Sequence, residues 1–280
     1  MQPFIGSQEV RRGALTRHDL ARDYRSIFRD VYLPRDIELT AKLRAQAAWL
    51  ASGAPLCGLS AAAVLGTKWL DPSDPAEILR ANRRSQAGLA VRSWTVGACE
   101  LCVVGDITVT TAARTAFDIG RTRPAPQAIP IVDAVLNATR ITAADVAAVA
   151  EAHRGVPGAA RLRAMLGLVD GGAESPQESR LRLVLVGAGL PTPQTQIEFR
   201  HLRIRVDMGW PEWKVAVEYD GVHHWTDRRQ RSWDIDRIAL LEAEGWTGGR
   251  LPDLTTVSPM QGFSRNHLHR THTRDPRHRR

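Results

Sequence analysis

The segment that decides the fold reads Arg205-Val206-Asp207-Met208-Gly209-Trp210-Pro211-Glu212-Trp213-Lys214-Val215-Ala216-Val217-Glu218-Tyr219-Asp220-Gly221. Two apolar, β-rich runs flank a proline-containing segment, and this pattern predicts a β-hairpin. With a four-residue loop at 211–214, Asp207 lies directly opposite Glu218, with Cβ atoms roughly 4.5–5.5 Å apart. Asp220 points to the same face as Glu218, because side chains alternate along a strand. The other face is expected to hold the apolar side chains Val206, Met208, Val217 and Tyr219.

Three carboxylates on one face of a hairpin repel one another, so the bare cluster is unfavourable. A hard divalent cation such as Mg²⁺ accepts carboxylate ligands and would remove the repulsion. The spacing therefore indicates a metal site at Asp207, Glu218 and Asp220. The alternative is an acidic surface strand whose register differs by two residues.

The bulk composition indicates a globular, soluble chain. Its 280 residues leave room for two domains, with 43% hydrophobic and 24% charged residues. No apolar run approaches the ~20 residues of a membrane helix, and the N-terminus lacks the pattern of a secretory signal. Three cysteines do not make a disulfide framework, so we expect a reducing, cytoplasmic location and no membrane partner.

The positive charge is concentrated at the C-terminus. The formal net charge is +8, and residues 264–280 contain six arginines and one aspartate. The tail at 251–280 is therefore expected to be basic and without regular structure. Charge alone favours a nucleic-acid partner only weakly.

The first 75 residues predict short helices and a small β element. Thr16 and Thr40 can each cap a helix, Ser60 can cap an Ala-rich helix, and the run from Phe28 to Pro34 reads as one strand. This order is typical of a winged helix-turn-helix, although periodicity does not separate that fold from another small α+β unit. Residues 76–168 predict a mixed connecting domain with strands at 76–80, 89–94 and 101–110. Helices follow after Thr111 and near 126–138 and 142–152, and no chemistry is evident there.

After the break at Gly171-Gly172, residues 169–250 predict a further domain. Ser175, Pro176 and Glu178 open a helix. Its inward side chains are expected to be Leu181, Val184, Leu185 and Ala188. Strands are predicted at 195–199, 202–210 and 215–219, and a helix at about 228–244. The order is helix, three strands, helix.

This order and its acidic motif resemble the PD-(D/E)xK nuclease superfamily. More closely, they resemble actinobacterial proteins with a domain of unknown function related to the very short patch repair endonuclease. The matching positions are Val206-Asp207-Met208, Val217-Glu218-Tyr219-Asp220-Gly221, His224, Asp234 and Arg237. The N-terminal region is similar to the winged helix of AbiEi-type antitoxins, through Gly13-Ala14-Leu15-Thr16-Arg17, Val31-Tyr32 and the run from Thr111 to Asp118.

The resemblance implies an α/β (α+β) protein with a restriction-endonuclease-like domain that hydrolyses DNA with Mg²⁺ or Mn²⁺. Asp207, Glu218 and Asp220 would hold the metal, and His224 would orient water or protonate the leaving oxygen. Glu178 would join the site, or would only cap its helix. Asp234 and Arg237 would support the site, or form a surface pair. The expected DNA contacts are Arg17, Arg22, Arg228 and Arg237; a toxin partner and a homodimer both stay open.

Two departures from the nuclease pattern bear on activity. Asp220 occupies the position where the superfamily has lysine. Thr247-Gly248-Gly249-Arg250-Leu251-Pro252 is poor for the buried strand that the fold requires, so we expect no paired strand there. The alternative function is a non-catalytic DNA-binding regulator of the type IV antitoxin kind, with a degenerate nuclease domain.

Overall fold

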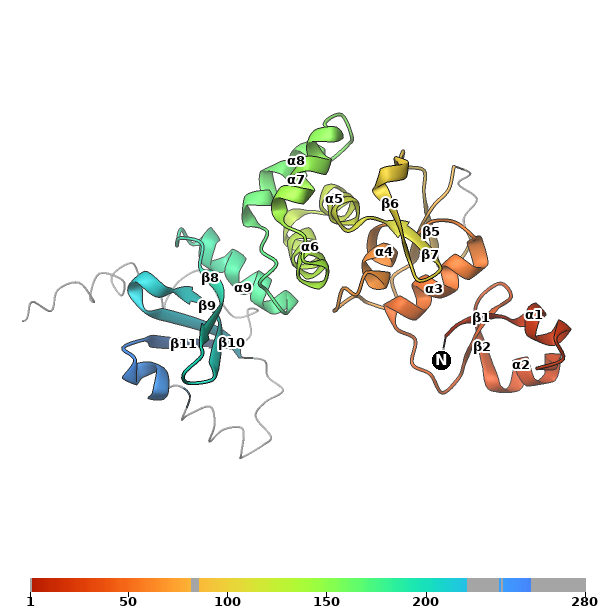
Figure 1. Cartoon of the computed structure of the whole chain (residues 1–280), viewed down its shortest axis with the longest axis horizontal. Helices are drawn as coiled ribbons and strands as arrows, with labels where there is room; N and C mark the ends of the chain where they lie inside the picture. Colours follow the sequence, from red (N-terminus) through yellow and green to blue (C-terminus); the bar gives the residue numbers. More distant parts are fainter. Residues whose placement is uncertain (1, 82–85, 221–236, 238, 253–280) are drawn as a thin grey trace, which may run out of the picture. The chain divides into compact units, whose positions relative to one another are not determined.

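The computed structural model describes residues 2–81, 86–220, 237 and 239–252. The chain divides into two compact units, Met1–Gly171 and Gly172–Arg280, both traced in Figure 1. The division coincides with the Gly171-Gly172 break in the sequence. Helices and several β-sheets occur together, so the expected α+β class holds at this level. Among the described residues, no helix has the length and apolar character required to cross a bilayer.

The chain begins with two short helices between the strands of a small antiparallel sheet. Its order is β1-β3-β2, and the elements are β1 (Phe4–Ile5), α1 (Gly6–Arg11), α2 (Arg17–Asp23), β2 (Tyr24–Phe28) and β3 (Val31–Pro34). The predicted cap is confirmed, since Thr16 Oγ1 accepts the Asp19 N–H at 3.1 Å. The prediction of one strand from Phe28 to Pro34 is wrong. Asp30 adopts a left-handed φ of 62°, so the chain turns there and forms a hairpin.

Two helices follow, α3 (Ala41–Ser52) and α4 (Gly58–Val64). Thr40 caps α3 as predicted, by accepting the Leu43 N–H at 3.2 Å. Ser60 does not cap α4, because that helix begins after Cys57. The Ser60 hydroxyl oxygen instead accepts the Glu77 N–H at 2.9 Å and joins α4 to the next strand.

Leu56 connects two strand pairs in the middle of the first unit. The pairs are parallel β4 (Ala76–Leu79) with β5 (Leu89–Arg92), and antiparallel β6 (Leu101–Val104) with β7 (Ile107–Thr110). Leu56 forms isolated bridges to Ile78 of β4 and Val109 of β7. One hydrophobic cluster includes Phe28, Ile78 and Val109. Residues on both sides of position 75 therefore share one core.

Helices make up the rest of the first unit, as Figure 1 shows. They are α5 (Ala112–Thr122), α6 (Ala125–Thr139), α7 (Ala143–Ala152) and α8 (Ala159–Met165). The first three lie where the sequence predicts them, and Thr111 precedes α5 as its N-cap. Helix α8 was not anticipated.

The second unit contains α9 (Pro176–Gly187) and a four-stranded sheet of order β11-β10-β9-β8, labelled in Figure 1. The strands are β8 (Gln194–Phe199), β9 (Ile204–Trp210), β10 (Val215–Asp220) and β11 (Thr247–Pro252). Strands β8, β9 and β10 form an antiparallel meander. The predicted hairpin register is confirmed, because Trp210 pairs with Val215 and Met208 with Val217. Residues 239–243 and Arg237 are helical, within the predicted range 228–244.

The expectation that no strand forms at 247–252 is wrong. Strand β11 pairs in parallel with β10, from Val215 with Thr247 to Asp220 with Pro252. It lies at the edge of the sheet, where only one side must be paired. Glycine and proline are tolerated at such an edge, and Pro252 stands at the strand's end. The tail at 253–280 lies outside the described residues.

Two expectations about buried side chains in this unit also require correction. Leu181 and Leu185 of α9 pack with Met208, Trp210 and Val217, but Val184 is 42% exposed and Ala188 is exposed too. The buried face of the helix instead includes polar residues, since Glu178, Ser179 and Arg182 are buried beside the two leucines. Val206 packs in a separate cluster with Ile197, Phe199, Ile204, Ala216 and Leu241. Strict alternation along β9 is therefore lost between Val206 and Met208, at Asp207.

Candidate acidic site

Asp207 lies where the sheet pairing is interrupted. On the β8 side, Thr195 pairs with Met208 and Ile197 with Val206, while Gln196 and Asp207 form no ladder pair within the described strands. The carboxylate Oδ2 of Asp207 accepts the backbone N–H of Tyr219 from β10 at 2.9 Å. Burial raises the pKa of Asp207, and the Tyr219 N–H partly opposes that rise. A half-buried carboxylate thus replaces a main-chain acceptor between two strands.

Glu178 reaches the same region from the first turn of α9. Its backbone N–H donates to the capping Ser175 hydroxyl at 3.2 Å. Its side-chain Oε2 accepts the Glu174 N–H at 2.9 Å and the Gln196 amide at 3.1 Å. The residue is only 8% exposed. Burial raises the pKa of Glu178, and the nearby Asp207 charge raises it further. Glu178 is thus both the N3 residue of a capped helix and a member of the acidic cluster.

Glu218 of β10 forms an ion pair with Arg237. An Arg237 guanidinium nitrogen donates to Glu218 Oε1 and to the backbone carbonyl of Arg205. Both side chains are largely buried, with 14% of Glu218 and 22% of Arg237 exposed. Arg237 thus contacts Glu218, whereas Asp234, its partner in the alternative surface pair, lies outside the described residues.

Asp207 thus lies near Glu178, and Arg237 acts on Asp207 while it pairs with Glu218. We call Glu178, Asp207 and Glu218 the acidic site. Asp220 ends β10, and its side chain is not described. The predicted residues His224, Arg228 and Asp234 lie outside the described residues. Within the described ranges, no group of three or more His, Cys, Asp or Glu side chains is arranged to hold a metal ion. Carboxylate oxygens are the type of ligand that Mg²⁺ prefers, but the carboxylates of the described residues do not by themselves form a metal-binding site.

Two residues of this region were missed by the sequence reasoning. Gln196 donates to Glu178 and adopts a φ of 52°, which is rare for a residue inside a strand. Glu174 donates its N–H to Glu178 and pairs with Arg205 at 2.7 Å. Gln196 was missed because a polar residue is ordinary in a strand of alternating pattern, and nothing in the sequence indicates its left-handed backbone.

The two predicted DNA-contacting arginines of the N-terminal region differ in their surroundings. Arg17 is exposed at the first position of α2. Arg22 contacts Asp23 at 2.7 Å and Asp19 at 3.3 Å. Its charge is therefore already offset by two carboxylates, and a phosphate would have to compete with them.

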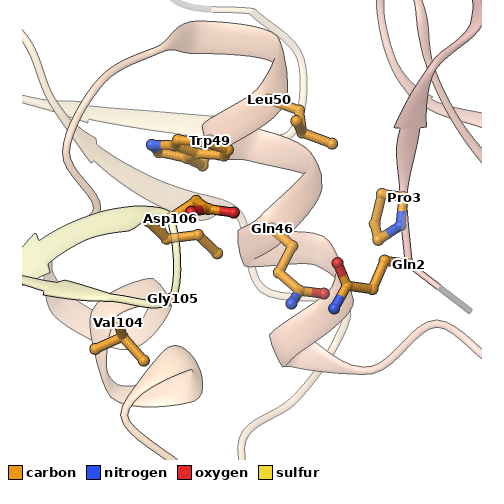
Figure 2. Close-up of a pocket in the computed structure, with 9 residues that line it drawn as sticks. Gln2, Pro3, Gln46, Trp49, Leu50, Val104, Gly105 and Asp106 are labelled. Atoms are coloured by element: carbon orange, nitrogen blue, oxygen red, sulfur yellow. The ribbon is translucent and has the colours of Figure 1, made fainter.

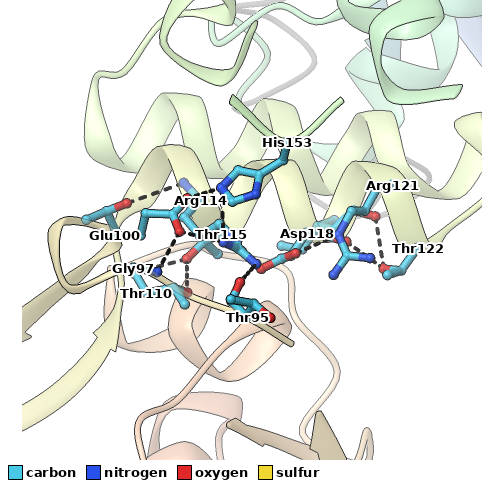
Figure 3. Close-up of polar contacts among 12 residues, drawn as sticks. Thr95, Gly97, Glu100, Thr110, Arg114, Thr115, Asp118, Arg121, Thr122 and His153 are labelled. Carbon is cyan, nitrogen blue, oxygen red and sulfur yellow. Dashed lines mark hydrogen bonds and ion pairs between the residues drawn. The ribbon is translucent and has the colours of Figure 1, made fainter. Parts of the chain in front are cut away.

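A buried ion network occupies the helical region where the sequence showed no chemistry (Figure 3). Arg114 is 1% exposed and donates to Asp118 at 2.8 Å, to Glu100 at 2.7 Å and to the Thr95 carbonyl at 3.1 Å. Glu100 also contacts His153 at 2.7 Å, and Asp118 accepts from Arg121 at 2.7 Å. These contacts join α5 to α7 and to the segment before β6. Burial raises the pKa of Asp118, while its two arginines oppose the rise.

The first unit also has a pocket of about 280 Å³, shown in Figure 2. Gln46, Trp49 and Leu50 of α3 line it, together with the turn between β6 and β7 and the first residues of the chain. None of the predicted site residues lines this pocket. The acidic site is therefore the better functional candidate.

Comparison with known proteins places the chain in a mycobacterial family. No family model matches the chain, and no solved structure matches it. It is 30% identical over 247 residues to the uncharacterized protein Rv2248 of Mycobacterium tuberculosis (strain ATCC 25618 / H37Rv), covering 85% of this chain and 86% of that protein. The uncharacterized protein MT2308 of strain CDC 1551 / Oshkosh matches to the same extent. The chain belongs to the family of these proteins.

Proposed function

We propose that this protein is a metal-dependent DNA endonuclease that hydrolyses phosphodiester bonds. Residues 169–250 would form its restriction-endonuclease-like domain, and residues 1–75 a winged-helix-like module that binds DNA. The order α9, antiparallel β8–β9–β10, then parallel β11 supports this proposal, because it supplies the strand that the sequence had left in doubt. The observation on which the proposal chiefly rests is the proximity of Glu178 and Asp207 at the interrupted ladder, with Arg237 linking Asp207 to Glu218 on the neighbouring strand.

Each residue of the acidic site would have a distinct task. Asp207 and Glu218, with Asp220 at the end of β10, would hold Mg²⁺ or Mn²⁺. A bound cation would activate water and neutralise charge that develops on the phosphate. Glu178 Oε2 accepts two N–H groups, so a proton would be held or released at its Oε1. Arg237 would limit repulsion by pairing with Glu218. His224 would orient water or protonate the leaving oxygen.

The direct test is nicking of supercoiled plasmid by the purified full-length protein with Mg²⁺, with Mn²⁺ and with a chelator. Asp207→Asn and Glu218→Gln should each lower the cleavage rate about 100-fold or more, since a metal-held transition state is worth several kcal/mol. Glu212→Gln is a matched control, because it removes one charge from an exposed position of the same hairpin. Cleavage that survives both site substitutions, or that ignores the chelator, would refute the proposal.

A second candidate is a non-catalytic DNA-binding regulator of the type IV antitoxin kind, with a toxin as its partner. The Glu218–Arg237 ion pair favours it, because the guanidinium already neutralises a carboxylate that a metal would need. Helices α1 and α2 followed by the β2–β3 hairpin would form the DNA-binding module, with Arg17 exposed on α2. The expected result is specific operator binding that Arg17→Ala weakens, together with no metal-dependent cleavage.

A further inference from the structure

Gln196 has the most unusual backbone of the acidic region. It lies inside β8 with a φ of 52°, between two residues that pair regularly with β9. Side chains with a β-carbon are disfavoured in this left-handed region, whereas glycine enters it freely. Such a conformation persists only where surrounding contacts impose it, and it is frequent at functional sites. Because glycine would adopt this backbone more easily, the presence of glutamine is best explained by a contact that its side chain makes.

That contact is the hydrogen bond from the Gln196 amide to Glu178. The amide nitrogen lies 3.1 Å from Glu178 Oε2, which also accepts the Glu174 N–H at 2.9 Å. Two donors on one oxygen fix the plane of the carboxyl group. Regular pairing would place Gln196 opposite Asp207, so the same interruption of the ladder affects both residues.

We propose that Gln196 is a positioning residue of the acidic site: its left-handed backbone directs the side-chain amide to Glu178 and holds that carboxyl group beside Asp207. The inference rests on the proposed endonuclease function. Among the described residues, the charges that act on Glu178 are those of Asp207 of β9 and of Glu174 before α9, and Glu174 itself pairs with Arg205. An ionised carboxylate donates no hydrogen bond, so neither Asp207 nor Glu174 can take the place of the Gln196 amide through its side chain.

Gln196→Gly separates positioning from a purely structural role. Glycine accepts the φ of 52° without a β-carbon penalty, and this gain offsets the loss of the hydrogen bond to Glu178, so the full-length variant should melt near the wild-type temperature. Its kcat for plasmid cleavage should fall roughly 10- to 100-fold with little change in KM, because a catalytic group is misplaced while DNA contacts stay. Glu198→Gly is the matched control, at an exposed position of the same strand. It should melt lower, since glycine weakens an ordinary strand, and should cleave at the wild-type rate.

A second measurement reports on the hydrogen bond without any cleavage. In ¹H–¹⁵N spectra, the side-chain amide resonances of Gln196 should move when Glu178 is replaced by alanine, and should not move in Glu198→Gly. Unchanged amide resonances, or a Gln196→Gly variant that melts below Glu198→Gly, overturn the inference. So does cleavage that Gln196→Gly leaves unchanged. A wild-type protein that cleaves no DNA refutes the proposed function, and the positioning role falls with it.

Discussion

The Oδ2 atom of Asp207 lies 2.9 Å from the backbone nitrogen of Tyr219, so a side chain of β9 satisfies a main-chain donor of β10. Substitution can therefore remove the negative charge of Asp207 while it keeps the oxygen that accepts this hydrogen bond. Asp207→Asn keeps an acceptor and should leave stability near that of the wild type. Asp207→Ala leaves the Tyr219 N–H unpaired and should cost about 1–3 kcal/mol. Urea unfolding of both variants measures the difference, and equal stabilities would contradict the bonding role.

The buried carboxyls predict how stability depends on pH. The folded-state pKa values of Glu178 and Asp207 are raised by burial, so the folded protein binds more protons than the unfolded chain over the window above about pH 4. The contribution of these groups is thus largest at low pH and is lost as pH rises through their folded pKa values. Relative to the wild type, Glu178→Gln/Asp207→Asn should gain stability as pH rises through that window. Urea titrations at several pH values test this, and a constant difference would contradict it.

Two glycines in neighbouring parts of the sheet should respond oppositely to alanine. A β-carbon on Gly248 of β11 meets no atom within 4 Å, so Gly248→Ala should stabilise the protein by about 0.5–1 kcal/mol. A β-carbon on Gly209 of β9 would lie 2.3 Å from the Val215 carbonyl oxygen, which is backbone and cannot turn aside. Gly209→Ala should therefore destabilise. Thermal melting compares the two, and a destabilising Gly248→Ala would mean that β11 is packed differently.

Arg237 should weaken metal binding by occupying Glu218. If the acidic site binds a cation, Arg237→Gln should lower the Mn²⁺ concentration for half-saturation, because guanidinium and metal compete for one carboxylate. Titration with Mn²⁺ followed by electron paramagnetic resonance measures this directly. Arg200→Gln is the control, since Arg200 pairs with Glu198 on an exposed surface. A half-saturation that rises in Arg237→Gln would show that the arginine supports the metal instead.

The Arg114 network should contribute strongly to the stability of the first unit. Asp118→Ala leaves the buried Arg114 and Arg121 without their shared carboxylate, and breaking such a pair costs about 3–5 kcal/mol. Asp36→Ala removes an exposed aspartate and should change stability by less than about 0.5 kcal/mol. Denaturant unfolding of the two variants gives both values. A small effect of Asp118→Ala would mean that the arginines find other acceptors.

Local patterns in the sequence were sufficient to predict the hairpin but not its surroundings. The Pro211–Lys214 loop and the alternating runs beside it set the register of Trp210 with Val215. Strand β11 could not be predicted, because its Gly-Gly and proline are unfavourable by propensity and its pairing with β10 is long-range. The side-chain contacts of Glu178 depend in the same way on Gln196, eighteen residues later in the chain.

The Arg114 network shows the same limit. Helical periodicity places Arg114, Asp118 and Arg121 on adjoining turns of α5, which the sequence alone implies. Glu100 and His153, which complete the network, approach from segments on either side in the sequence. Tertiary packing decides which distant residues become partners. The buried ion network could therefore not be predicted from the sequence of the helical segments alone.

The parallel pairing of β10 with β11 has a consequence for the order of folding. The β8–β9–β10 meander needs only short connections, whereas β11 docks after a crossover of 26 residues between Asp220 and Thr247. On the ribosome, the strands that hold Asp207 and Glu218 would thus leave the exit tunnel, and could pair, before β11 emerges. Until β11 docks, the outer edge of β10 presents unpaired backbone groups, and such edges recruit other strands. A chain interrupted before Thr247 would retain its acidic residues and gain a strong tendency to aggregate.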